Sequence, residues 1–161
     1  IGLRTAQLCK AFGCKVIANA PHPKKEAEGI VEYVDLETLL KESDIISLHC
    51  PLNDSSRGLI NKERIALMKP TAIVINAARG PVVDSQALAD ALNEGRIAGA
   101  GIDVFEVEPP LDVNHPLLHS KNTIVTPHVA FASAESMEAR CHIVFDNITK
   151  WLAGEQVNVI L

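Results

Sequence analysis

Three polar side chains between residues 79 and 128 are of the types that carry out proton and hydride chemistry on small acids. An arginine such as Arg79 binds a carboxylate through paired charge-assisted hydrogen bonds and polarises a neighbouring carbonyl group. A histidine such as His128 gives a proton to an oxygen, or takes one from it, near neutral pH. A glutamate such as Glu108 holds an imidazole in one orientation and favours its protonated form. Together these residue types suit redox chemistry on a hydroxy or keto acid.

Each of the three residues also has a structural interpretation that the residue types alone leave open. A histidine after a strand is often a structural or surface group, and Arg79 could merely cap a loop. Glu108 stands directly before two prolines, so it could be a solvated turn residue. The catalytic interpretation is favoured because all three residues follow predicted strands.

Short apolar runs alternate with helical patterns along the chain. The predicted helices have apolar side chains at helical spacing and begin or end at residues typical of helix caps, such as Asp35 and Gly13. The predicted strands are apolar throughout, which is typical of burial on both faces. Alternation of the two predicts a doubly wound α/β fold with a parallel sheet, Rossmann-like and lacking its first strand. We expect strands at 15–18, 44–48, 72–76, 97–104 and 123–125, and helices at 3–12, 35–40, 85–93 and 133–153.

The residues with chemical potential follow the carboxyl ends of these strands. Arg79 comes after the strand at 72–76, and His128 comes after the strand at 123–125. Asp103 lies at the carboxyl end of the glycine-rich strand at 97–104, and Glu108 follows that strand. Ligands of open parallel sheets bind at these strand ends, so we expect the four side chains to meet at one rim.

Composition excludes several classes of function. Lys plus Arg is 15 and Asp plus Glu is 20, so the net charge is −5 and a general nucleic-acid surface is not expected. No run of 18 apolar residues predicts a membrane-spanning helix. The cysteines form no CxxC pair, which is typical of reduced thiols in a cytoplasmic protein, and we expect most of them to be buried: Cys9, Cys14, Cys50 and Cys141.

Two segments carry a family resemblance. NAARGPVVDSQALADALNEGRIAGAGIDVFEVEPP, at 76–110, and TPHVAFAS, at 126–133, contain the motifs R-G, D-V-F-x-x-E-P and P-H in that order. The chain thereby resembles the NAD-dependent D-2-hydroxyacid dehydrogenase family. The resemblance implies an oxidoreductase that transfers a hydride between a nicotinamide cofactor and a D-2-hydroxy or 2-keto acid. It assigns catalysis to Arg79, Glu108 and His128, with Glu108 preferred over Glu106 because it directly precedes the proline.

The resemblance also implies which residues contact the cofactor. Asp103 is expected to bind the nicotinamide carboxamide, and Ala78 to contact the ring through its backbone, beside Arg79 and His128. Cys50 and Pro51 are expected to shape the loop on the adenine side. Gly2 matches the last glycine of a G-x-G-x-x-G fingerprint.

In the family's fold, the residue at the end of the second strand indicates which cofactor binds. In this chain that residue favours NAD over NADP only narrowly. The family normally has an acid there that binds the ribose hydroxyls, but this chain has Asn19. His22, Lys24 and Lys25 could instead bind a 2′-phosphate, or they could form a solvated basic turn. No metal is expected, since His49 has no second ligand at metal spacing.

The organisation implied by the resemblance is a single dinucleotide-binding domain over 1–161, truncated at its N-terminus, with the substrate-binding domain absent from this chain. Alone, this stretch is expected to have little or no turnover. The resemblance further implies a homodimer. Two alternatives stay open: a non-enzymatic, corepressor-like sensor of NAD(H), and an inactive truncated fragment.

Overall fold

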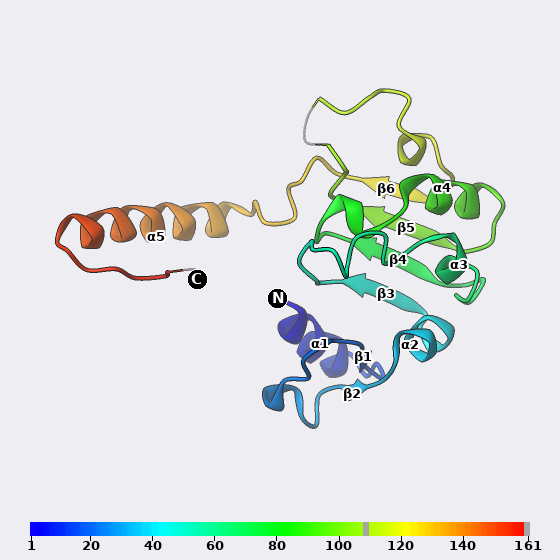
Figure 1. Ribbon diagram of the computed structural model, residues 1–161, viewed down its shortest axis with the longest axis horizontal. Coiled ribbons are helices and arrows are strands. Elements are labelled where there is room, and N and C mark those ends of the chain that lie inside the picture. Colours follow the sequence, from blue (N-terminus) through cyan, green and yellow to red (C-terminus); the bar gives the residue numbers. More distant parts are fainter. Residues whose placement is uncertain (108–109, 160–161) are drawn as a thin grey trace. The chain divides into compact units, whose positions relative to one another are not determined.

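The computed structural model describes residues 1–107 and 110–159. They divide into two compact units, Ile1–Pro127 and His128–Leu161, and each unit is described by itself. Figure 1 traces both, with the first unit running from blue to yellow.

Four parallel strands form the main sheet of the first unit, in the order β3-β4-β5-β6 (Figure 1). Their last residues are in register, since Leu48 pairs with Asn76, Asn76 with Ile102, and Ile102 with Val125. The four strands therefore end at one level of the sheet. The strands are β3 (Ile45–Leu48), β4 (Ile73–Asn76), β5 (Gly99–Ile102) and β6 (Thr123–Val125).

A second, smaller sheet pairs β1 (Ile17–Ala18) with β2 (Glu32–Tyr33), again in parallel. Helix α1 (Gly2–Ala11) precedes it, and the short 3₁₀ helix η1 (Lys25–Ala27) connects its strands. Among the described strands, none joins β1 to β3, so each keeps an edge without a strand partner. The predicted parallel α/β class is confirmed.

Side-chain caps start the helices that follow strands of this unit. Asp35 accepts the backbone N–H of Thr38 at the start of α2 (Leu36–Glu42), and Asp84 accepts that of Ala87 at the start of α4 (Ser85–Asn93). Asn61 caps α3 (Lys62–Ile65), a single turn too short for a periodic pattern to predict. Two further 3₁₀ helices are η2 (Gly80–Val82) and η3 (Pro116–Leu118).

The core lies on one face of the main sheet, which corrects the expectation that every strand is buried on both faces. In β3 burial alternates, and Ile45 is 64% exposed while Ile46 is buried. Ile124 in β6 is 73% exposed. The physical reason is that, within this unit, helical side chains cover a single face and pack there against Ile46, Val74 and Ile102; they are Leu40, Ile65, Leu88, Leu92 and Leu117.

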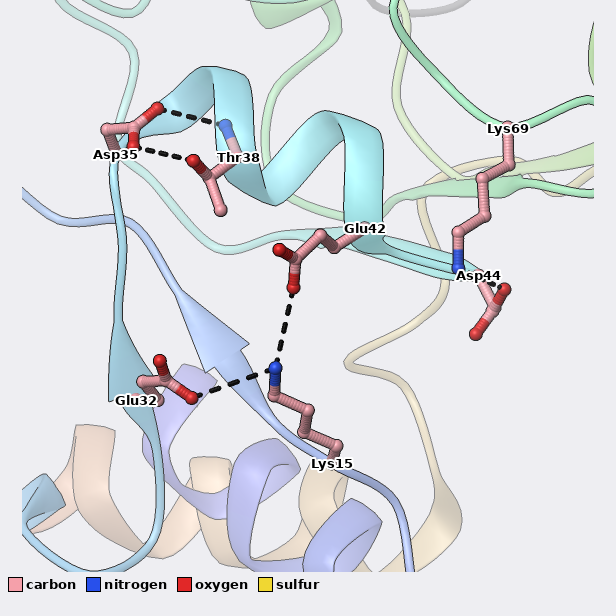
Figure 2. A network of polar contacts seen from close by, with 7 residues as sticks. All are labelled: Lys15, Glu32, Asp35, Thr38, Glu42, Asp44 and Lys69. Carbon is pink, nitrogen blue, oxygen red and sulfur yellow. Dashed lines mark hydrogen bonds and ion pairs between the residues drawn. The ribbon is translucent and has the colours of Figure 1, made fainter.

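Charged side chains join the small sheet to α2, as Figure 2 shows. Lys15 Nζ lies 3.8 Å from Glu32 Oε2 in β2 and 3.4 Å from Glu42 Oε2 at the end of α2. Lys69 pairs with Asp44, just before β3, at 2.8 Å. All these groups are at least one-third exposed, so they orient the segments but contribute little stability each.

The second unit is dominated by α5 (Ala134–Leu152), a 19-residue helix capped by Ser133. It confirms the helix expected at 133–153, yet no residue of it is buried. Its exposed apolar side chains include Val144, Ile148, Trp151 and Leu152, which recur at helical spacing.

The expectation of mostly buried cysteines is wrong. All four are free thiols; Cys9 and Cys50 are half-buried, whereas Cys14 and Cys141 are exposed. The cause is the exposure of the helices: α1 has no buried residue, and Cys141 lies in α5. Within the described residues, no helix combines the length and apolar character needed to cross a membrane.

Candidate active site

The carboxyl ends of the four strands gather polar residues at one level of the main sheet. His49 follows β3, and Ala78 and Arg79 follow β4. Asp103 follows β5, and Thr126 follows β6. The prediction that strand ends bring Arg79 and Asp103 to one rim is therefore confirmed by the topology of the first unit.

The loop that carries Arg79 is braced by a buried amide. Asn76, the last residue of β4, is 1% exposed. Its Nδ2 donates to the carbonyl oxygen of Arg79 at 3.0 Å, and its Oδ1 accepts the N–H of Ala78 at 3.1 Å. The exposed Arg79 guanidinium donates through one nitrogen to the Ala78 carbonyl at 2.6 Å. Sequence reasoning missed Asn76 as a site residue; the available signal was an amide side chain at the end of a buried apolar strand.

Asp103 links the ends of three strands. It is 6% exposed, and its backbone N–H donates to the Asn76 carbonyl at 2.9 Å. Its Oδ1 accepts the hydroxyl of Thr126 at 2.5 Å. Asp103, which is predicted to bind the nicotinamide carboxamide, thus lies between β4 and β6, and hydrogen bonding fixes its carboxylate.

Gly80 allows the loops after β4 and β5 to touch. A Cβ at this position would lie 2.0 Å from the carbonyl carbon of Phe105 and 2.5 Å from the nitrogen of Glu106. No side chain fits at such distances, so glycine is required next to Arg79 if the two loops are to keep this spacing.

The D-V-F-x-x-E-P motif contains two glutamates after Asp103. Glu108 lies outside the described residues. Glu106 accepts the hydroxyl of Ser85 on Oε1, and its Oε2 lies 3.1 Å from Nε2 of His115. Burial opposes ionisation of Glu106, but hydrogen bonds from Ser85, from its own backbone and from His115 outweigh it, so its pKa lies below the ordinary value.

His128 opens the second unit. Its backbone has a positive φ of 55°, and its ring packs edge-to-face on Phe131 with centroids 5.8 Å apart. The guanidinium of Arg140 in turn stacks 5.1 Å from the centroid of Phe131. Because Arg79 belongs to the first unit, the meeting of His128 with Arg79 stays a prediction.

The start of α1 lies against the end of β3. A Cβ on Gly2, the first residue of α1, would lie 3.2 Å from Cβ of His49. His49 Nε2 is 3.0 Å from the hydroxyl of Ser47, and partial burial lowers the pKa of His49. The first N–H groups of a helix have no acceptor within it and suit an anion. Gly2 lets the start of α1 pack closely against His49.

The remaining predicted cofactor residues lie on loops of the first unit. Cys50 is half-buried against the core, and burial raises its pKa. The carbonyl of Pro51 accepts the hydroxyl of Ser56 at 2.6 Å. Asn19 directly follows β1, and its Nδ2 donates to the carbonyl of Val34 at 2.9 Å. His22, Lys24 and Lys25 are exposed.

No cluster of three or more His, Cys, Asp or Glu side chains suited to a metal ion occurs in the ranges 1–107 and 110–159. A parallel α/β sheet with polar groups at its strand ends and a glycine at a helix start defines a nucleotide-binding domain of the Rossmann class. Comparisons with known proteins then identify the family.

Residues 1–130 match the family model of the D-isomer specific 2-hydroxyacid dehydrogenase, NAD binding domain. The chain belongs to this family. It is 43% identical over 162 residues to a hydroxypyruvate reductase of Blautia hydrogenotrophica, covering 99% of this chain and 50% of the relative. It is 47% identical over 157 residues to a glyoxylate reductase of Thermococcus litoralis, covering 96% and 47%.

Solved structures agree with the sequence comparisons. A D-lactate dehydrogenase of Treponema pallidum superposes with a TM-score of 0.90 at 38% identity, covering 100% of this chain and 53% of that chain. A D-lactate dehydrogenase of Lactobacillus jensenii with NAD⁺ gives a TM-score of 0.91 at 37% identity, covering 100% and 52%. The chain thus spans about half the length of the relatives that it matches.

Proposed function

We propose that this chain is the cofactor-binding part of an NAD-dependent D-2-hydroxyacid dehydrogenase. The main observation that supports this proposal is the position of the Arg79 loop. Asn76 and Gly80 hold this loop beside Asp103, at the strand ends where this fold class binds dinucleotides. Membership of the family and the NAD-bound relative support the same reaction.

The residues of the first unit fit the cofactor. The N–H groups at the start of α1 suit the pyrophosphate. The fixed carboxylate of Asp103 suits the carboxamide of the nicotinamide, and the Ala78 backbone suits the ring. When bound, NADH supplies the hydride and NAD⁺ accepts it.

Catalysis is assigned to three side chains of this chain. Arg79 binds the substrate carboxylate and polarises the carbonyl. His128 donates a proton to the carbonyl oxygen during reduction and removes it from the hydroxyl during oxidation. Glu108 orients the imidazole. Arg79 and His128 together stabilise the charge that develops on the oxygen. Both carboxylate oxygens of Glu106 are already hydrogen-bonded, to Ser85 and His115, and this supports Glu108 as the acid that orients the imidazole.

The substrate is a small 2-keto or 2-hydroxy acid, such as the hydroxypyruvate, glyoxylate or lactate that the names of the relatives contain. We assign the other half of the cleft to a substrate-binding domain outside residues 1–161, since these residues span about half the length of the relatives. For this reason residues 1–161 alone should have little or no turnover.

Assembly as a homodimer is supported by α5. Its exposed side chains include Phe145, Ile148 and Trp151, which are 69%, 50% and 65% exposed. Apolar surface of this kind on one helix is typical of protein interfaces. Free thiols at all four cysteines support a reducing, cytoplasmic location.

Steady-state assays of the full-length protein test the reaction. NADH oxidation with hydroxypyruvate, glyoxylate and pyruvate should be robust with at least one acid, and NADH should be preferred over NADPH. Binding of NADH without consumption of any acid would instead support a sensor. Failure both to bind NADH and to turn over would indicate an inactive protein.

A further inference from the structure

Glu106 has no role in the proposed mechanism. It lies on the segment between β5 and η3, four residues after the end of β5. Its carboxylate bridges two elements that are distant in the sequence: Ser85, the first residue of α4, and His115, the residue before η3. We call these three residues the Glu106 bridge.

The two partners of Glu106 are themselves held in place. Ser85 is 9% exposed, and the His115 side chain is 12% exposed. Nδ1 of His115 accepts the backbone N–H of Leu117 at 3.3 Å. In the neutral ring the proton is therefore on Nε2, which donates to Oε2 of Glu106 at 3.1 Å. The ring of His115 also packs edge-to-face on Phe105, with centroids 5.1 Å apart.

The bridge acts on the same backbone that touches Gly80. The carbonyl carbon of Phe105 and the nitrogen of Glu106 lie where a Cβ on Gly80 would meet them at 2.0 and 2.5 Å. Gly80 directly follows Arg79, and the Arg79 carbonyl is held by Asn76. A continuous set of contacts thus leads from the Glu106 carboxylate through the backbone of 105–106 to the loop of Arg79.

We propose that Glu106 is a positioning residue, which presses the loop after β5 against Gly80 and thereby fixes the loop that presents Arg79. This inference rests on the proposed function, because it takes Arg79 as the ligand of the substrate carboxylate. In this role Glu106 acts through the loop and not by contact with the substrate or the cofactor.

The hydrogen bonds of the Glu106 carboxylate favour a positioning role over direct catalysis. Both of its oxygens accept hydrogen bonds from groups outside the proposed catalytic set. The Glu106 side chain is 37% exposed, so its position depends on these two hydrogen bonds rather than on burial. A bonded, ionised carboxylate is suited to holding a loop, since charge-assisted hydrogen bonds are about twice as strong as neutral ones.

The test compares Glu106→Gln and Ser85→Ala with the control Glu94→Gln in the full-length enzyme. Glu94 is an exposed carboxylate at the end of α4. Both bridge variants should reduce kcat/KM for the keto acid by about 10- to 100-fold, since misplacement by about 1 Å costs up to about 10². Their effects should be strongly non-additive in the double variant, while the Kd for NADH stays within about twofold.

Three results would overturn the positioning role. Wild-type kcat/KM in Glu106→Gln would remove it. A loss of about 10⁴-fold or more in Glu106→Gln, with Ser85→Ala unaffected, would make Glu106 a catalytic group. Equal losses of NADH affinity, thermal stability and activity would indicate a general structural role.

A second readout separates the bridge from the proposed function. Hydrogen exchange at residues 79–83 and 105–107 should be faster in Glu106→Gln than in wild type and unchanged in Glu94→Gln. If the wild type reduces no keto acid but this exchange pattern is found, the proposed function fails and the bridge stands. Unchanged exchange in Glu106→Gln would overturn the bridge whatever the activity.

Discussion

Helices α4 and α5 carry similar amphipathic patterns but have different fates in the structure. In α4, five of nine residues are buried, Leu88 and Leu92 among them, against the main sheet. In α5, none of 19 residues is buried, although Val144, Ile148 and Trp151 form a comparable apolar set. An apolar helix face stabilises a fold only when something covers it. The first unit therefore contains its own core, whereas α5 in the second unit has no buried face.

The two units also divide the proposed catalytic residues. Arg79 and Asp103 lie on the first unit, and His128 opens the second. If both units serve one reaction, a change in either should abolish turnover.

The largest expected effect comes from the second unit. His128→Ala should reduce kcat by about 10²- to 10⁴-fold, because a positioned acid–base group contributes about that factor. NADH affinity should change little, as measured by fluorescence titration of the full-length protein. Arg79→Lys provides the matched test in the first unit and should also lose most activity, since an ammonium lacks the guanidinium fork. A normal rate in His128→Ala would remove that unit from catalysis.

A pair of leucine truncations measures the contrast between the helices directly. Leu88→Ala in α4 should lower the free energy of unfolding by about 2–5 kcal/mol, because the residue is fully buried. Leu152→Ala in α5, where the side chain is 72% exposed, should change it by about 0.5 kcal/mol or less in the monomer. Urea denaturation at low protein concentration provides the measurement. A large loss in Leu152→Ala that grows with protein concentration would identify a dimer interface on α5.

Gly80→Ala tests the close contact between the loops of the first unit. The added Cβ would meet the Phe105 backbone at 2.0 Å, so one of the loops must move. We expect a loss of about 1–3 kcal/mol in stability, typical of overpacking, and a raised KM for the keto acid because Arg79 is displaced. Gly95→Ala is the control, since its Cβ position has no neighbour within 4 Å although its φ is positive. Equal KM values in the two variants would contradict the argument.

The smallest expected effect is a pH dependence of the Glu106 bridge. The folded-state pKa of Glu106 lies below its ordinary value, so the unfolded chain binds more protons through this group between the two pKa values. The stabilisation is therefore complete above the ordinary glutamate pKa and is lost as the pH falls through the lowered one. The stability difference between wild type and Glu106→Gln should be constant near neutral pH and shrink on acidification. A difference that grows toward acid would have the wrong sign.

Much of the fold was predictable because its signals are local. Asp35 and Ser133 cap helices through contacts three residues away, and the runs at 72–76 and 123–125 predict β4 and β6 within one residue. The motifs around Arg79 and Asp103 likewise identified the family that the comparisons confirm. Burial was predicted less well, since the apolar run of β3 cannot reveal whether one face or both are covered.

The sequence by itself determined the parallel α/β class, the family and the candidate chemistry, because strand and helix patterns and short motifs are written in neighbouring residues. Only the tertiary structure decided that Asn76 braces the Arg79 loop, that Gly80 admits Phe105, and that Ser85 and His115 share Glu106. These contacts join residues up to 25 positions apart, and their geometry depends on strand order and loop packing. No local pattern encodes such distances.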